Sequence, residues 1–308
     1  MSLTEFDLIE QYFHRPTVSS VVVTGMGDDA AVLAIPPSAD WVTSVDTLVE
    51  SVHFFAGAPP EAIGYKSLAV SLSDMAAMGA EPKVALLAIT LPTIDKSWLK
   101  AFTSGFFGLA DRFQVALIGG NVTRGPLTVS VVVDGAVPKG RALLRSGAKE
   151  GDLIYVTGTL GDAGLALDKL KQDKPCEENL LQRYYYPSPR VFEGMALRDI
   201  ATAAIDISDG LVADVEKLCQ ASCVGAHIQA NDLPVSTSNA VKYALTAGDD
   251  YELCFTVSTL NRARVKEIFS EFKCGAHCVG EITKQMGVVV FDASQQPMTI
   301  RKKGYEHF

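Results

Sequence analysis

Aspartates that follow apolar runs or adjoin glycines are the residues of this sequence whose type and spacing could do chemistry. They are Asp28 and Asp29 in GMGDDAAV, Asp46 in SVDTLVE, Asp74 in SLSDMAAMGA, Asp206 and Asp209 in IDISDGL, and Asp249 and Asp250 in AGDDYEL. A single aspartate in such a place commonly caps a helix or shapes a turn. Asp74 and Asp206 resist that explanation, because each follows small or apolar residues where an ionised carboxylate needs a partner. Several such carboxylates in a chain with few clustered lysines suggest shared divalent cations, and oxygen-only ligands of this type suit Mg²⁺.

Glycine-rich segments add a weaker indication of phosphate binding. Gly25, Gly27 and the pair Gly119 and Gly120 each follow a strand-like run, where we expect their backbone N–H groups to be open to a phosphate. The sequence contains no Walker loop, kinase catalytic-loop signature, dinucleotide fingerprint or GxSxG elbow. Of the five histidines only His53 lies near the aspartate-rich segments, so schemes with a catalytic histidine are not favoured.

Composition excludes several classes of partner and location. The chain has 308 residues, with 27 Lys and Arg against 36 Asp and Glu, and therefore a formal net charge of −9. This balance argues against a nucleic-acid partner, which needs clustered basic residues. No apolar stretch approaches the roughly 18 residues of a membrane-spanning helix, and no signal peptide is evident, so we expect no membrane association and a cytoplasmic location. The six cysteines are expected to be reduced thiols, because two loosely spaced pairs do not make a convincing zinc site.

The elements that must position these residues alternate between helix and strand. Helices are predicted at 4–13, 61–78, 97–113, 162–171, 211–221 and 262–272, and strands at 20–23, 41–45, 83–90, 115–118, 127–137, 153–157, 203–207, 226–229, 251–257 and 288–291. A polar, glycine-bearing stretch near Ala148 is the best candidate for a boundary. We therefore expect an α/β (α+β) protein with domains at 1–147 and 148–308.

The motifs taken together resemble those of the thiamine-monophosphate kinases. The segments that carry the resemblance run in family order over essentially the whole chain: GMGDDAAV, SVDTLVESVHF, YKSLAVSLSDMAAMGAEP, LIGGNVTRGPL, GRALLRSGAKEGD, YVTGTLGDAG, IDISDGL, AGDDYELCFTV and KGYEHF. The resemblance implies the two-domain fold shared with aminoimidazole ribonucleotide synthetase and selenophosphate synthetase. It also implies a homodimer formed through the N-terminal domain, with a C-terminal α/β domain that completes the active-site cleft.

The implied reaction transfers the γ-phosphoryl group of ATP directly to thiamine monophosphate, giving thiamine diphosphate and ADP, with ATP as co-substrate and several Mg²⁺ ions. Carried over position by position, the resemblance gives metal ligands at Asp29, Ser44, Val45 (through its backbone), Asp46, Asp74, Asn121, Asp206 and Asp209. It gives ATP contacts at Gly120, Asn121, Arg145 and Ser208, and substrate contacts at His53, Asp249 and Tyr305. Asp74, Arg145 and Asp209 are then the residues expected to act in catalysis. The sequence leaves open whether K⁺ assists.

Three positions depart from the family pattern. The family usually has an aspartate where Asn121 stands, often a threonine where Val45 stands, and usually Gly-Glu-Asp at the segment containing Asp249 and Asp250. An asparagine can still bind Mg²⁺ through its carbonyl oxygen, and Val45 keeps its backbone carbonyl. The alternatives are another ATP-dependent synthetase of the same superfamily, a nucleotide-binding protein without turnover, and a zinc-stabilised scaffold.

Overall fold

A computed structural model describes residues 4–16 and 19–307 of the chain. The chain forms two compact units, each an α/β layer of helices on a sheet. The first contains the residues up to Met75 together with Ala80–Gly140, and the second contains Ala76–Gly79 and the residues from Arg141 onward. Among the helices of the described residues, none is both long enough and apolar enough to span a membrane.

The first unit is built on a four-stranded sheet in the order β3-β6-β4-β5, in which only β4 and β5 run parallel. Its elements are α1 (Glu5–Leu8), a π-helical turn (Ile9–Phe13), β1 (Val22–Thr24), β2 (Val32–Leu33), β3 (Ala39–Val49), α2 (Pro60–Ala77), β4 (Glu81–Leu91), α3 (Lys96–Phe113), β5 (Ala116–Arg124) and β6 (Thr128–Pro138). The predicted first helix is confirmed, and a reciprocal cap starts it: the Thr4 N–H donates to the Asp7 carboxylate at 2.8 Å, and the Asp7 N–H donates to the Thr4 hydroxyl at 3.2 Å.

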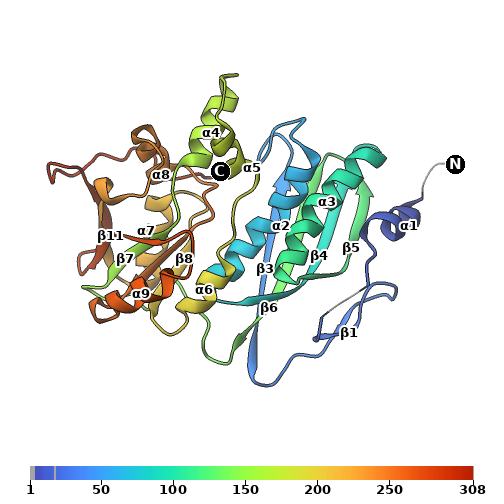
Figure 1. Ribbon diagram of the computed structural model, residues 1–308, viewed down its shortest axis with the longest axis horizontal. Helices are drawn as coiled ribbons and strands as arrows, with labels where there is room; N and C mark the ends of the chain where they lie inside the picture. The colour runs from blue at the N-terminus through green and yellow to red at the C-terminus, as the bar shows by residue number, and fades with distance from the viewer. Residues whose placement is uncertain (1–3, 17–18, 308) are drawn as a thin grey trace. The chain divides into compact units, whose positions relative to one another are not determined.

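Helices α2 and α3 lie side by side on one face of this sheet (Figure 1). Their backbones come so close that a Cβ on Gly64 would lie 2.0 Å from the Phe102 carbonyl oxygen, and one on Gly105 would lie 1.9 Å from that of Glu61. The Ser71 hydroxyl of α2 donates to the Val131 carbonyl of β6 at 3.2 Å, which joins helix and sheet. Only glycine permits such an approach of two helices, so the position of α2 on the sheet is closely fixed.

The second unit contains a six-stranded sheet in the order β12-β9-β11-β7-β10-β8, with only β12 and β9 parallel. Its elements are β7 (Leu153–Thr157), α4 (Asp162–Lys171), α5 (Glu178–Tyr185), α6 (Val191–Leu197), β8 (Ala201–Asp206), α7 (Leu211–Ser222), β9 (Gly225–Gln229), α8 (Val241–Thr246), β10 (Leu253–Val257), α9 (Arg262–Phe269), β11 (Ala276–Thr283) and β12 (Gly287–Phe291), with short 3₁₀ turns at Ala230–Asp232, Ser238–Ala240 and Thr259–Asn261. The apolar face of α7, which includes Leu218, packs in one core with residues of the sheet such as Ile205 of β8 and Val156 of β7.

Two predictions about local structure are wrong. Gly119 and Gly120, expected to follow the strand predicted at 115–118, lie inside β5, next to an irregularity in its pairing with β4. The strand predicted at 251–257 begins only at Leu253, because Asp249 and Tyr251 have φ angles of 69° and 50° and cannot continue an extended strand. Helices α5, α6 and α8 and strands β2 and β11 were not predicted.

Candidate active site

In the first unit, strand β3 and helix α2 bring two carboxylates together. Ser44 and Asp46 are two residues apart on β3 and therefore point to the same face, toward α2. The Ser44 hydroxyl donates to the carboxylate of Asp74, which lies near the end of α2. One carboxylate oxygen of Asp46, Oδ2, is buried and accepts no hydrogen bond. Burial raises the pKa of Asp46 to about 6, the nearby Asp74 carboxylate adds to this rise, and a hydrogen bond from Ser71 opposes it.

These donors fit a magnesium ion. Mg²⁺ in enzymes is usually held by one or two carboxylates, with waters and substrate phosphates completing its coordination. Asp46 and Asp74 supply two carboxylates, Ser44 a hydroxyl, and the unpaired Asp46 Oδ2 an oxygen whose burial needs a compensating cation. Over residues 4–16 and 19–307, no three His, Cys, Asp or Glu side chains are grouped so that they could hold a metal by themselves. The pair therefore has the character of a site that needs a ligand's oxygens as well.

The hydrogen bonds described for this unit do not connect the side chains of the other predicted residues to Asp46 or Asp74. The Val45 side chain points to the opposite face and is 61% exposed, so only its backbone could assist. In the sheet register Gly120 is level with Leu87, whereas Asn121 is level with Ala88 and belongs to the face opposite Asp46. Asp29 lies in an exposed bend between β1 and β2, where its N–H donates to the Asp28 carboxylate at 2.9 Å.

His53 follows the end of β3, and its ring is oriented by the backbone. The Val49 N–H donates to His53 Nδ1 at 3.0 Å. That bond requires an unprotonated Nδ1, so the neutral ring carries its proton on Nε2. His53 is therefore set to act as a hydrogen-bond donor through Nε2.

In the second unit, the turn between β8 and α7 brings five predicted residues together. Asp206 ends β8 and is buried, and the turn that follows it contains Ser208 and Asp209. The Ser208 carbonyl accepts the N–H of Asp249 at 3.0 Å, and the Asp209 carbonyl accepts that of Tyr305 at 3.0 Å. Three distant parts of the sequence thus meet at one turn through backbone hydrogen bonds.

Arg145 lies in the same unit, on a loop that is fixed although its side chain is exposed. The Ser222 hydroxyl at the end of α7 donates to the Arg145 carbonyl at 2.9 Å and accepts the N–H groups of Gly147 and Ala148 at 3.1 and 3.2 Å. The carbonyl of the preceding residue, Leu144, accepts the Ala204 N–H of β8 at 2.9 Å. A guanidinium held on such a loop can bind a pair of phosphate oxygens.

Two groups of charged residues near the turn were not found by reasoning from the sequence. Asp214 and Lys217 of α7 form an ion pair at 2.7 Å, and Lys217 also contacts Asp209. The sequence did contain a signal for Asp214, because it falls on the apolar stripe of α7 with Leu211, Val215 and Leu218. An acidic residue at an apolar position of a helix indicates a buried carboxylate with a partner.

The second group is a fully buried glutamate between two arginines. Glu252 accepts hydrogen bonds from Arg183 at 2.8 Å, from Arg190 at 2.6 Å and from the Thr157 hydroxyl at 2.7 Å. Its neighbour Asp250 accepts the Gly161 N–H at 2.8 Å, and burial raises the pKa of Asp250 well above its ordinary value, while the Arg183 charge opposes this. These groups fix the segment that carries Asp249.

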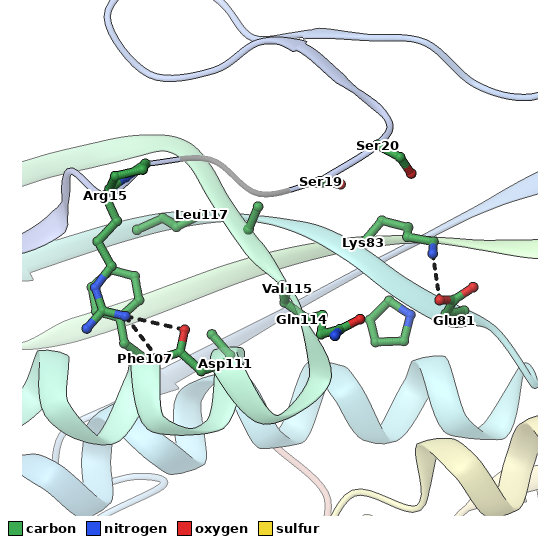
Figure 2. A pocket seen from close by; sticks show the side chains of 14 residues that line it. Arg15, Ser19, Ser20, Glu81, Lys83, Phe107, Asp111, Gln114, Val115 and Leu117 are labelled. Carbon is green, nitrogen blue, oxygen red and sulfur yellow. Dashed lines mark hydrogen bonds and ion pairs between the residues drawn. The ribbon is translucent and has the colours of Figure 1, made fainter.

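A pocket of about 360 Å³ lies elsewhere in the first unit, at the end of α3 and the start of β5. Figure 2 shows its charges already paired, Arg15 with Asp111 at 3.2 Å and Lys83 with Glu81 at 2.6 Å. None of the predicted site residues lines it. We do not include this pocket in the candidate active site.

Comparison with known proteins identifies the family. Residues 27–137 match the AIR synthase related protein N-terminal domain, and residues 149–293 match the corresponding C-terminal domain. The thiamine-monophosphate kinase of Salmonella typhimurium strain LT2 is 44% identical over 322 residues, covering 100% of this chain and 99% of that protein. The crystal structure of thiamine-monophosphate kinase from Stenotrophomonas maltophilia K279a has a TM-score of 0.87 and 41% identity, and the match covers 94% of this chain and 97% of that one.

A further solved structure, of AaThiL complexed with AMPPCP and TMP, has a TM-score of 0.79 and 30% identity, and covers 98% of this chain and 96% of that one. The similarity thus extends over both units and includes the segments that contain the carboxylate pair of β3 and α2 and the turn after β8. The chain belongs to the thiamine-monophosphate kinase family, within the AIR synthase related proteins.

Proposed function

We propose that the protein transfers the γ-phosphoryl group of ATP to thiamine monophosphate, giving thiamine diphosphate and ADP. Its membership of the thiamine-monophosphate kinase family carries this proposal, and the structure adds the carboxylate pair of Asp46 and Asp74 beside the Ser44 hydroxyl. Phosphoryl transfer needs little beyond in-line placement of the reactants and neutralisation of the negative charge on the transferred group. The residue inventory of both units is suited to these two tasks.

In the first unit, Asp46, Asp74 and Ser44 would hold Mg²⁺, with Asp29 and the Val45 backbone carbonyl as further ligands. Asn121 lies on the opposite sheet face and could bind a metal only as part of a separate site. In the second unit, Asp206 and Asp209 would do the same. Bound Mg²⁺ supplies positive charge to the phosphate oxygens and orients them. The buried Oδ2 of Asp46 supports this assignment most directly, because it accepts no hydrogen bond from any described residue.

ATP would be held by Gly120, Asn121, Arg145 and Ser208. Gly120 lies in β5, an edge strand that pairs with β4 alone, so part of its backbone is open to a ligand. The Arg145 guanidinium would pair with phosphate oxygens, and Ser208 would donate its hydroxyl. Asp74, Arg145 and Asp209 are the residues to which we assign the charge stabilisation of the transfer itself.

Thiamine monophosphate would contact His53, Asp249 and Tyr305. Its phosphate oxygen is the nucleophile, and a phosphomonoester, whose second pKa is about 6, is already anionic near neutral pH. A general base is therefore unnecessary. The Nε2–H of His53 would donate to the phosphate, and the Asp249 carboxylate, which accepts a hydrogen bond from the Tyr251 hydroxyl at 3.1 Å, would face the cationic part of the substrate.

We also propose that the protein is a homodimer formed through the exposed part of the sheet face opposite α2 and α3; the rest of that face, at Trp41 and Val84, packs against residues around β1 and β2. Thr43, Val45 and Thr47 of β3 point to that face and are exposed, and Val132 of β6 lies level with Val45. A partly apolar sheet face of this kind favours burial against a second copy of the same face.

Phosphorus NMR of the purified protein with ATP, Mg²⁺ and thiamine monophosphate tests the proposed reaction. We expect thiamine diphosphate and ADP to form together, and no ADP beyond background when the thiamine compound is omitted. Asp74→Asn should abolish turnover at ordinary Mg²⁺ while leaving the far-UV circular dichroism unchanged, because it weakens the metal site without removing packing. ATP binding without transfer in the wild-type protein would instead indicate another acceptor or a protein that only binds nucleotide, and full turnover in Asp74→Asn would refute its assigned role.

A further inference from the structure

The turn that carries Ser208 and Asp209 is held from its inner side by a carboxylate that has no assigned role. Asp214 Oδ2 accepts three consecutive backbone N–H groups, those of Ser208 and Asp209 at 3.0 Å each and that of Gly210 at 3.1 Å. Its other oxygen, Oδ1, pairs with the Lys217 ammonium at 2.7 Å. Asp214 is fully buried in the apolar face of α7, so these partners account for its burial.

The outer side of the same turn holds the residues assigned to the thiamine substrate. The carbonyls of Ser208 and Asp209 accept the N–H groups of Asp249 and Tyr305. The packing leaves little freedom: a Cβ added to Gly248 would lie 2.0 Å from the Ser208 carbonyl oxygen, and one added to Gly304 would lie 2.8 Å from that of Asp209. Displacement of the turn would therefore also displace the two segments bound to it, which contain Asp249 and Tyr305.

We propose that Asp214 is a positioning residue that sets the nucleotide side and the thiamine side of the site together. It acts through the backbone of residues 208–210: on one side of these peptides are the N–H groups bound to Asp214, and on the other the carbonyls that hold Asp249 and Tyr305. Charge-assisted hydrogen bonds of this type are about twice as strong as neutral ones. The proposal rests on the proposed function, which assigns Ser208 and Asp209 to ATP and metal and Asp249 and Tyr305 to thiamine monophosphate.

This arrangement predicts a kinetic signature that a direct contact residue would not give. Asp214→Asn keeps the size of the side chain and one acceptor oxygen, but it replaces a carboxylate with an amide and places an NH₂ group against the Lys217 ammonium. We expect the KM for ATP and the KM for thiamine monophosphate to rise together, each by about tenfold, which corresponds to about 1.4 kcal/mol per substrate. A variant of a residue that contacts one substrate, such as Asp249→Asn, should raise one KM only.

The matched control is Asp152→Asn. Asp152 is also a buried aspartate that accepts a backbone N–H, that of Lys149 at 2.9 Å, and a hydroxyl, that of Thr202 at 2.7 Å. It lies just before β7 and makes no contact with the turn in the hydrogen bonds described. Asp152→Asn should lower stability to a similar degree and leave both KM values within about twofold.

A second measurement reports on the stability of the turn itself and does not depend on enzyme activity. Hydrogen exchange of the Ser208, Asp209 and Gly210 amides, followed by NMR after selective ¹⁵N labelling, should accelerate by about tenfold in Asp214→Asn and stay unchanged in Asp152→Asn. If the wild-type protein makes no thiamine diphosphate, the proposed function fails, while the exchange result still decides whether Asp214 holds the turn. Unchanged exchange with unchanged KM values in Asp214→Asn would overturn the positioning role, as would equal rises in both KM values for Asp152→Asn.

Discussion

Removal of one charge from the pair on β3 and α2 should make the metal-free protein more stable. Burial and the Asp74 carboxylate raise the pKa of Asp46 from 3.8 to about 6, a difference that corresponds to about 3 kcal/mol at neutral pH. Because the pKa is raised, the stability linked to this group is full below about pH 3.8 and is lost as the pH rises through about 6. Asp46→Asn removes the ionised form and keeps an oxygen for Ser71. Allowing for relaxation around the site, we expect a gain of about 2 kcal/mol at pH 7.5.

Thermal unfolding in EDTA at one fixed protein concentration measures this gain. For units of this size about 1 kcal/mol moves the melting temperature by about 2–4 °C, so Asp46→Asn should melt about 4–8 °C higher than the wild type at pH 7.5. At pH 4.5 the folded wild-type protein has a protonated Asp46, and the difference should shrink to about one third. Added Mg²⁺ should stabilise the wild type more than the variant, since a ligand that binds only the folded state raises its stability.

Asp40→Asn provides the control on the same strand. The Asp40 carboxylate accepts the Gly140 N–H at 2.6 Å, so the same chemical change there should lower stability slightly, by about 1 kcal/mol. A melting temperature for Asp46→Asn equal to or below that of the wild type at pH 7.5 would refute the reasoning, because it would mean that neither burial nor the Asp74 carboxylate disfavours the ionised form of Asp46 in the metal-free fold.

Three further changes have expected outcomes. Glu252→Gln removes the carboxylate shared by the largely buried Arg183 and Arg190, leaving Arg190 only its longer contact with Glu193 at 3.6 Å, and should lower the free energy of unfolding by about 3 kcal/mol, measured by urea denaturation; a loss below about 1 kcal/mol would contradict the buried cluster. Arg145→Lys keeps the charge but not the paired donors and should raise the KM for ATP about tenfold at unchanged melting temperature, while an unchanged KM would remove Arg145 from the nucleotide site. Val45→Glu places a charge on the exposed part of the sheet face opposite α2 and α3 and should shift the protein toward monomer in sedimentation velocity. Asp134→Asn is a milder change on the same face, and an unaltered dimer in Val45→Glu would locate the interface elsewhere.

The sequence predicted the long, regular elements well. Helices at 61–78 and 97–113 were predicted and found as α2 (Pro60–Ala77) and α3 (Lys96–Phe113). Both are long: α3 has an apolar stripe that repeats over several turns, whereas α2 is apolar on nearly every side. Helices α5 and α6 were missed because they are short and separated by the prolines of YYYPSPR. Strand β11 was missed because its sequence, AHCVGEIT, contains a glycine and no clear alternation of apolar and polar residues.

The site was predicted less evenly. Asp46 and Asp74 could be singled out from their surroundings, since a carboxylate in an apolar run needs a partner. The association of Asp209 with Asp249 and Tyr305 depends on contacts between residues far apart in the chain, and only the resemblance to a family indicated it. The pairing of Glu252 with Arg183 and Arg190 could not be predicted for the same reason: no local pattern in the sequence indicates which arginine contacts which glutamate after folding.

The close approach of α2 and α3 at Gly64 and Gly105 has a consequence for the accuracy of the carboxylate pair. Asp74 is carried by α2, whereas Asp46 belongs to the sheet, so the gap between their carboxylates depends on where α2 lies over the sheet, and the close contact with α3 limits that position. A methyl group at either glycine would have to push the helices apart by more than 1 Å, and ligand geometry around Mg²⁺ tolerates only a few tenths of an ångström. Gly64 and Gly105, which have no side chains, thereby help to set the distance between the carboxylates of Asp46 and Asp74.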